Sequence, residues 1–186
     1  MRELSLHIID IIENSRRAGA NLIKLVINEK PVSDNLLTIE ISDNGKGISA
    51  EKLAQITDPF VTSRTTREVG LGLALFKSAA ESCAGKLIIK STPGEGTDVE
   101  ANFQYDHLDR APLGDITTTI SNFIAASGDK VDLIYQHYYE NNSFDFDTRK
   151  IKQELDDLSI QNRQVTVWLR EYIQENLAKI RGGEAF

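Results

Sequence analysis

Two polar side chains in an apolar helical pattern near the N-terminus have the types and the spacing needed for chemistry. Asp10 and Asn14 lie four residues apart, so in a helix they project from the same face. The Asp10 carboxylate can hold a proton or a water, and the Asn14 amide oxygen is a hard neutral ligand that suits Mg²⁺. The alternative is that both residues are solvated polar positions on an amphipathic helix.

A second group of residues follows an alternating, β-branched stretch at 36–42. Asp43 stands at its end, where the carboxylate could accept a hydrogen bond from a ligand amine. Gly45 and Gly47 allow backbone conformations and close approaches that a Cβ would block. An ordinary β-turn before a helix is the alternative interpretation, because Asp-Asn-Gly is common in turns.

A third group could bind an anion. Gly70 and Gly72 open a strongly apolar helix predicted over 71–83, and glycines at a helix start expose backbone N–H groups and the positive end of the helix dipole. The preceding segment 61–69 has hydroxyls and basic residues but little apolar pattern, which predicts a mobile loop. Its two basic residues are Arg64 and Arg67. A hinge without a ligand is the alternative.

Hydrophobic periodicity predicts the elements that must position these groups. Helical spacing indicates a helix over 3–17 that ends at Gly19, and a short helix over 49–56 with Ser49 as its N-cap. Residues alternate as in strands at 22–29, 36–42, 86–92 and 97–104. Up to about residue 105 these elements predict an α/β (α+β) two-layer sandwich, with helices on one face of a mixed, mostly antiparallel sheet.

Residues 106–186 are predicted to form a small α/β extension of unknown role. The expected elements are a helix over 116–127, a β-hairpin from 132–139 and 143–147, a helix over 148–158 capped by Thr148, and an amphipathic helix over 164–180. The apolar stripe of the last helix can pack on the core of the extension itself or dock a partner. The first of these is the favoured interpretation.

Composition limits the class of protein. A chain of 186 residues can hold one domain, or one plus a small appendage. The formal net charge of −7 argues against nonspecific nucleic-acid binding, and the single cysteine excludes a disulfide framework. The charged N-terminus is unlike a signal peptide, and no apolar run reaches the roughly 20 residues that span a bilayer. A cytoplasmic protein without a membrane span is expected.

The motifs, in their order along the chain, resemble those of the GHKL ATPase superfamily. This superfamily includes gyrase B subunits, chaperones of the Hsp90 type, histidine kinases and MutL proteins. The matching motifs are Asp10-x-x-x-Asn14-Ser15, Asp43-x-Gly45-x-Gly47, Asp58-Pro59-Phe60 with Thr62, Gly70-x-Gly72 and Gly96-Thr97. The resemblance covers about residues 3–104. It implies the Bergerat ATP-binding fold for residues 1–105.

The resemblance also implies a role for each motif. Asn14 would ligate the Mg²⁺ that bridges the phosphates of ATP. Asp43 would accept the adenine amino group, with a water shared by Thr97. Gly45 and Gly47 would let the backbone pass close to the base. The other nucleotide-binding residues would be Arg17, Ile48, Thr62, Arg64, Gly70, Leu71 and Gly72.

Two departures from the ATPase branches of the superfamily concern the reaction. Those branches carry a Glu four residues before the Asn as the general base, and this chain has Asp10 there. Glu13 is a poorer candidate base, since it lies about 100° around the helix from Asn14. The segment 61–69, which would be the lid over ATP, looks more like that of nitrogen-regulatory histidine kinases than that of gyrase or MutL.

Three functions remain open at this point. The leading hypothesis is an ATP·Mg²⁺-binding protein of the histidine-kinase type that transfers the γ-phosphoryl group to a separate protein. The kinase type is favoured by the kinase-like lid and by the absence of a Glu at the base position. A separate acceptor is expected because no dimerisation domain is expected before Asn14, and because none of the three histidines lies in a phosphoacceptor motif. The alternatives are an ATP hydrolase with Asp10 as its base, and a non-catalytic nucleotide sensor. A homodimer is a further expectation.

Overall fold

The computed structural model describes residues 3–56 and 72–183. Its strands form one six-stranded sheet in the order β3-β4-β2-β1-β5-β6. The strands are β1 (Leu22–Lys30), β2 (Leu36–Asp43), β3 (Lys86–Thr92), β4 (Gly96–Gln104), β5 (Asp132–Tyr139) and β6 (Asn142–Asp147). All neighbouring pairs are antiparallel except β1 and β5, which run parallel. The mixed, mostly antiparallel sheet of the prediction is confirmed.

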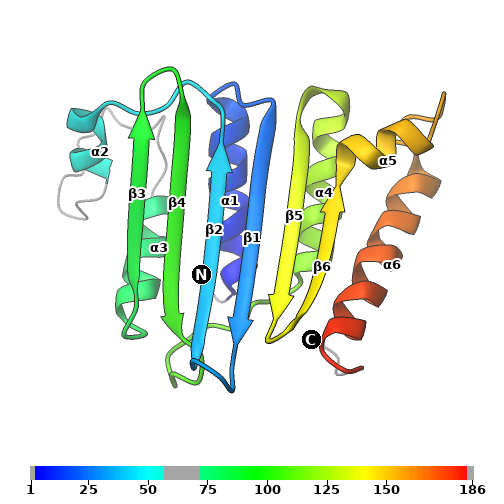
Figure 1. Ribbon diagram of the computed structural model, residues 1–186. Coiled ribbons are helices and arrows are strands. Elements are labelled where there is room, and N and C mark those ends of the chain that lie inside the picture. The colour runs from blue at the N-terminus through cyan, green and yellow to red at the C-terminus, as the bar shows by residue number, and fades with distance from the viewer. Residues whose placement is uncertain (1–2, 57–71, 184–186) are drawn as a thin grey trace.

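Helices cover one face of this sheet (Figure 1). The helices are α1 (Leu4–Arg17), α2 (Ala50–Ile56), α3 (Gly72–Glu81), α4 (Ile116–Ser127), α5 (Thr148–Glu154) and α6 (Arg163–Ile180). In Figure 1, α1, α3 and α4 lie behind the strands, while the front face of the sheet carries no helix among the described residues. This is the two-layer α/β arrangement expected from the sequence.

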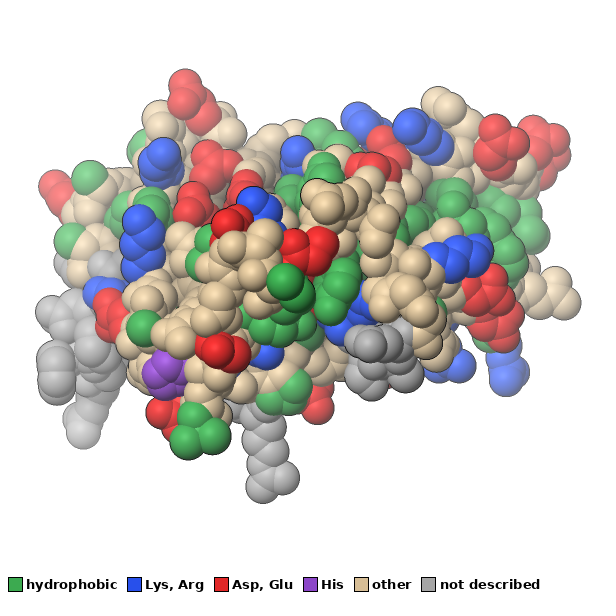
Figure 2. Space-filling view, turned by 60° about the horizontal axis from the view of Figure 1, so that its bottom comes forward, with side chains coloured by type: hydrophobic (Ala, Val, Ile, Leu, Met, Phe, Trp, Pro, Cys, Tyr) green, Lys and Arg blue, Asp and Glu red, His purple; other side chains and the backbone are tan. Residues whose placement is uncertain are grey.

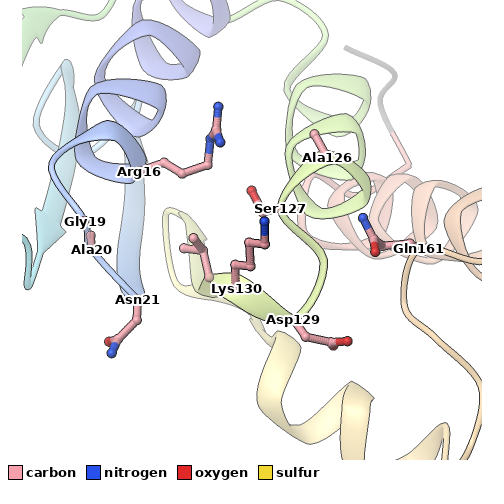
Figure 3. Close-up of a pocket in the computed structure, with 10 residues that line it drawn as sticks. Arg16, Gly19, Ala20, Asn21, Ala126, Ser127, Asp129, Lys130 and Gln161 are labelled. Atoms are coloured by element: carbon pink, nitrogen blue, oxygen red, sulfur yellow. The ribbon is translucent and has the colours of Figure 1, made fainter.

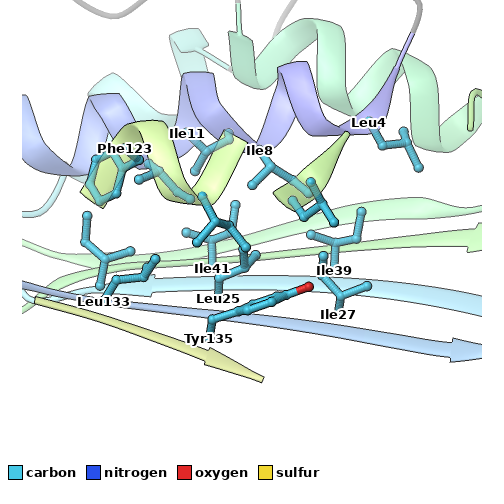
Figure 4. Close-up of a cluster of buried hydrophobic side chains, with 14 of the residues drawn as sticks. Leu4, Ile8, Ile11, Leu25, Ile27, Ile39, Ile41, Phe123, Leu133 and Tyr135 are labelled. Carbon is cyan, nitrogen blue, oxygen red and sulfur yellow. The ribbon is translucent and has the colours of Figure 1, made fainter. Parts of the chain in front are cut away.

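The core lies between α1 and the central strands. Every second residue of β1 is buried, as Ile23, Leu25 and Ile27 show with 0% exposure. The buried stripe of α1, which includes Ile8 and Ile11, packs on them (Figure 4). Burying such a side chain stabilises the fold by about 1.5–3 kcal/mol. The opposite, polar side of α1 is therefore fixed in orientation relative to the sheet.

The strands after residue 105 extend the same sheet. β5 pairs in parallel with β1, so that Ile23 lies opposite Leu133 and Leu25 opposite Tyr135. α4 contacts both α1 and α6, and α6 also contacts β5 and β6. The apolar stripe of α6 therefore packs on other elements of the extension, which is the interpretation favoured from the sequence. The boundary near residue 105, between β4 and α4, stays a prediction.

Part of the apolar stripe predicted for α6 remains open. Trp168 is 45% exposed, although its ring stacks on Tyr172 at 5.2 Å between centroids. On the face shown in Figure 2, acidic and basic side chains are interspersed, and hydrophobic side chains gather at the right-hand end.

No helix within residues 3–56 and 72–183 combines the length and the hydropathy needed to cross a membrane.

The N-cap predicted for α5 is wrong by one residue. The Asp147 side chain accepts a hydrogen bond from the Arg149 backbone N–H, so Asp147 is the N-cap. The hydroxyl of Thr148 is buried and accepts a hydrogen bond from the Leu133 N–H at 2.8 Å. Sequence alone does not separate two adjacent capping residues, because the choice depends on the neighbouring strand.

Candidate functional site

The Asp43 carboxylate is oriented from two sides. At the end of β2, its Oδ2 accepts a hydrogen bond from the Ser15 hydroxyl at 2.6 Å, and its Oδ1 accepts one from the Gly45 N–H at 2.8 Å. Ser15 is 3% exposed and belongs to α1, so this bond joins the helix to the strand end. Because each carboxylate oxygen can accept two bonds, Asp43 keeps capacity for a ligand donor.

Thr97 lies beside Asp43 and is fixed by a residue that the sequence did not indicate. Asp43 and Thr97 are opposite each other in the antiparallel β2–β4 pair. The Ser91 hydroxyl lies 2.8 Å from the Thr97 hydroxyl and accepts a hydrogen bond from the Ile48 N–H, also at 2.8 Å. Ser91 therefore connects two of the predicted nucleotide-binding residues. A lone serine in a strand gives no signal of this role.

Ser15 is a second residue to which the sequence prediction assigns no role, although its position in the sequence gives a hint of one. It follows Asn14 directly in the first motif of the resemblance. A serine on the buried side of an amphipathic helix suggests a partner across the core, since buried hydroxyls are normally hydrogen-bonded. Only the tertiary structure shows that this partner is Asp43.

The glycines of the turn permit close packing against the protein itself. Gly47 has a φ of +66°, and a Cβ there would lie 2.1 Å from the Thr92 carbonyl oxygen. A Cβ on Gly45 would lie 3.1 Å from the Ala18 carbonyl oxygen. The turn after β2 is thus pressed against the β3–β4 turn and the end of α1. No side chain larger than glycine fits at Gly47 without moving backbone.

The start of α3 lies against Asp10. A Cβ on Gly72 would be 3.3 Å from the Asp10 Cβ and 3.4 Å from its Oδ2. The exposed Asp10 carboxylate therefore stands beside the first turn of α3, where backbone N–H groups lack helical partners. The predicted anion site and the predicted base thus adjoin each other in space.

The other polar side chains of α1 divide into two groups. The Asn14 Oδ1 accepts a hydrogen bond from the Arg17 Nη1 at 3.3 Å, so the two predicted nucleotide-binding residues are adjacent. The Glu13 Oε2 accepts hydrogen bonds from the Arg16 Nε at 3.0 Å and Nη2 at 2.7 Å. This ion pair engages Glu13 and leaves Asp10 as the acidic candidate near Asn14.

A neutral histidine packs α1 on α3. The His7 ring stacks on Phe76 with 5.1 Å between centroids and 16° between planes, and the residue is 2% exposed. Burial lowers the pKa of His7, as does the N-terminal charge, against the opposite effect of Asp10. The imidazole therefore serves as a neutral packing surface between the two helices that carry Asp10 and Gly72.

The donor set at this end fits Mg²⁺ bound largely through phosphates and water. Among residues 3–56 and 72–183, no three His, Cys, Asp or Glu side chains cluster as a metal site. Mg²⁺ dehydrates reluctantly and is usually held by few protein oxygens together with substrate phosphates. A single amide oxygen at Asn14 matches that requirement.

Several predicted residues lie outside the part of the chain that the structure describes. These include the lid segment 61–69 and the motif Asp58-Pro59-Phe60. The individual nucleotide-binding candidates concerned are Thr62, Arg64, Gly70 and Leu71, together with Arg67 of the lid. Their roles stay predictions.

Comparison with known proteins bears on the fold and on residues 2–107. An uncharacterized sensor-like histidine kinase of Rhizobium meliloti is 37% identical over 44% of this chain and 17% of its own length. The Sensor protein kinase WalK of Staphylococcus aureus is 33% identical over 48% of this chain and 23% of its own length. The Non-motile and phage-resistance protein of Caulobacter vibrioides is 38% identical over 53% of this chain and 12% of its own length.

These relatives are much longer, so the chain spans less than a quarter of each of them. A crystal structure of the N-terminal domain of a DNA repair protein shares the fold, with a TM-score of 0.53 and 17% identity over 78% of this chain and 52% of the other. Residues 2–107 match the family model described as "Histidine kinase-, DNA gyrase B-, and HSP90-like ATPase". The chain therefore belongs to this family, and these residues form an ATP-binding domain of its histidine-kinase-like kind.

Proposed function

We propose that this chain binds ATP together with Mg²⁺ and transfers the γ-phosphoryl group to a separate protein. The observation that carries the proposal is that one helix, α1, contacts both the predicted adenine end and the predicted phosphate end of the site. Ser15 of α1 fixes Asp43, which would bind the adenine end, and Asp10 of α1 meets Gly72 at the phosphate end. The names of the sensor-kinase relatives support a kinase over other members of the family.

The proposed roles follow from the contacts. Asp43 would accept the adenine amino group with the lone pairs that Ser15 and Gly45 leave open. Asn14 would hold Mg²⁺, which neutralises phosphate charge, and Arg17 would add a positive charge beside it. Phosphoryl transfer depends mainly on such positioning and charge neutralisation.

We also propose that residues 106–186 form an extension that follows the ATP-binding domain.

A second candidate function, ATP hydrolysis, is favoured by one contact. Asp10 stands against the start of α3, close to where the phosphates would bind. Glu13 is engaged by Arg16, so Asp10 is the better placed of the two carboxylates to activate a water. The Asp10 side chain is one methylene shorter than the Glu of the ATPase branches, which argues for slow hydrolysis.

Labelled ATP separates these functions. The full chain is incubated with γ-labelled ATP, Mg²⁺ and the proteins that co-purify with it, and free phosphate and protein-bound label are both measured. We expect label on a co-purified protein and little free phosphate. Phosphate release that Asp10→Asn abolishes and the control Glu13→Gln retains would instead establish hydrolysis. Tight ATP binding without either product would leave a nucleotide sensor.

The proposed Mg²⁺ ligand has its own test. Asn14→Ala should make ATP affinity independent of Mg²⁺, because the amide oxygen is the only protein ligand proposed. Calorimetric titration with and without Mg²⁺ measures this, and Asn102→Ala on the open face of the sheet serves as the control. An unchanged Mg²⁺ dependence in Asn14→Ala would refute the assignment.

A further inference from the structure

A cavity of about 540 Å³ lies between the C-terminal ends of α1 and α4. Its wall includes Arg16 from α1, and Ser127, Lys130 and Gln161 from the later part of the chain (Figure 3). Arg16 lies two residues after Asn14, about 200° around the helix, and so projects to another side. The lining includes none of the residues predicted to bind the nucleotide, although Asn21 on the wall exchanges hydrogen bonds with Asn44, next to Asp43.

One buried hydroxyl in this cavity has no partner. Ser127 is 4% exposed, and its Oγ makes no hydrogen bond within the described residues. Ser121, in the same helix, shows the usual alternative, since its hydroxyl bonds to the Thr117 carbonyl at 2.9 Å. A buried hydroxyl that forgoes such a bond and lines a cavity is available to a ligand.

Two cationic side chains border the same space. Lys130 forms no ion pair among the described residues, and Arg16 uses Nε and Nη2 on Glu13, which leaves its Nη1 end available. Figure 3 shows Arg16 reaching from α1 toward α4, and Lys130 extending on the side of Ser127. The one acid of the wall, Asp129, is 77% exposed and lies 3.8 Å from Lys152.

We propose that this cavity binds a small phosphate monoester, with Arg16, Ser127 and Lys130 around the phosphate group. Two cations suit a dianion better than a monoanionic carboxylate, and a serine hydroxyl adds a short hydrogen bond to an oxyanion. The formal net charge of the whole chain is −7, whereas the wall of this cavity carries two cations and one acid. The volume leaves room for the ester group beyond the phosphate.

The test is an NMR titration of the ¹⁵N-labelled full chain with inorganic phosphate, glycerol phosphate and acetate, in the presence of saturating ADP·Mg²⁺. We expect saturable shifts of the Gly19, Asn21 and Val131 amides, with glycerol phosphate binding at least as tightly as inorganic phosphate. Acetate should bind at least tenfold more weakly. Equal affinity for acetate, exclusion of glycerol phosphate, or shifts only at Gly45 and Gly72 would overturn the proposal.

Variants then assign the residues. Lys130→Gln and Ser127→Ala should each weaken glycerol phosphate binding at least fivefold, whereas Lys24→Gln, on the open face of the sheet, removes the same charge and should change nothing. Amide spectra without ligand show whether each variant keeps the native fold. If Lys24→Gln weakens binding as much as Lys130→Gln, the effect is one of overall charge and the proposal fails.

Discussion

The two ends of β1 both carry polar clusters, but the clusters differ in how fully their hydrogen bonds are satisfied. Near Ile23, the Asp43 carboxylate accepts one protein donor on each oxygen and is partly exposed. Six residues further, about 20 Å along the strand, Glu29 is 2% exposed and accepts from three side chains. Its donors are His137 at 2.6 Å, Tyr105 at 3.1 Å and Arg181.

The buried cluster has defined protonation states. The Tyr135 hydroxyl lies 2.6 Å from the His137 Nδ1, and the His137 Nε2 faces Glu29, which fits a neutral ring with its proton on Nε2. Burial lowers the pKa of His137. Burial alone would raise the pKa of Glu29, but the bonds from His137 and the charge of Arg181 bring it below the usual value. Burial and the Glu29 carboxylate raise the pKa of Tyr105 to about 12.

This contrast distinguishes a structural cluster from the proposed binding site. At Glu29 the acceptors are occupied by protein groups from β5, from the segment after β4 and from the end of α6, so the cluster fastens distant parts of the chain together. At Asp43 the protein fixes the carboxylate and leaves acceptor capacity open. The predictions below test this distinction.

The largest effect is expected from Glu29→Ala. Removing the carboxylate takes one acceptor from the part-buried Arg181 charge and one from the buried His137 ring, which should lower the free energy of unfolding by about 3–5 kcal/mol. Urea denaturation measures it. Glu40→Ala, on the exposed face of β2, is the control and should change stability by less than about 0.5 kcal/mol. Equal losses in both variants would show that the cluster adds nothing beyond a surface charge.

Asp43→Asn should show the opposite pattern. The amide replaces an acceptor with a donor, so ATP binding should weaken by about 1.5–3 kcal/mol, or roughly 10- to 150-fold, with a smaller change in stability. Calorimetric titration with ATP measures the affinity. Asp98→Asn, one residue beyond Thr97 and exposed, is the control. A normal affinity in Asp43→Asn would remove Asp43 from the proposed adenine site.

The buried cluster should also make stability depend on pH. The pKa of His137 is lower in the folded state than the ordinary 6.5, so the unfolded chain binds more protons just below pH 6.5 and stability falls there on acidification. The lowered pKa of Glu29 adds a further loss below about 4.5. Each proton that the unfolded chain binds and the folded chain does not changes the free energy of unfolding by at most about 1.4 kcal/mol per pH unit.

His137→Gln isolates the contribution of the histidine to this dependence. Glutamine keeps a donor for Glu29 but does not titrate, so denaturation curves at pH 7 and 5.5 should differ less in the variant than in the natural chain. His7, whose pKa is also lowered, keeps part of the slope in both. An identical pH dependence in the two proteins would contradict the assignment of a neutral buried His137.

The smallest effect is expected at the α5 N-cap. Asp147→Ala should cost about 1 kcal/mol of unfolding free energy, because the Arg149 N–H loses its acceptor. The nearby Asp145→Ala, on an exposed position of β6, should cost less than about 0.5 kcal/mol. Thermal or urea denaturation resolves the difference. If Thr148→Val proved costlier than Asp147→Ala, the strand contact of Thr148 would outweigh the cap.

The sequence by itself determined the elements and the order of the motifs. The β1, β2 and β3 strands and the α1 and α4 helices lie within one or two residues of their predicted bounds, because periodicity and capping act over a few neighbouring residues. Asp10 and Asn14 share α1, and Asp43 ends β2, as the local pattern requires. The two-layer fold followed from these elements.

Only the tertiary structure decided which distant residues meet. Glu29 reads as an ordinary strand residue until β5 pairs with β1 and brings in His137, 108 positions away. Ser15 and Ser91 gain their roles in the same way, through partners in other parts of the chain. The physical reason is that sheet order and register are set by the whole core. Local spacing fixes where a side chain stands in its element, but not what lies opposite it.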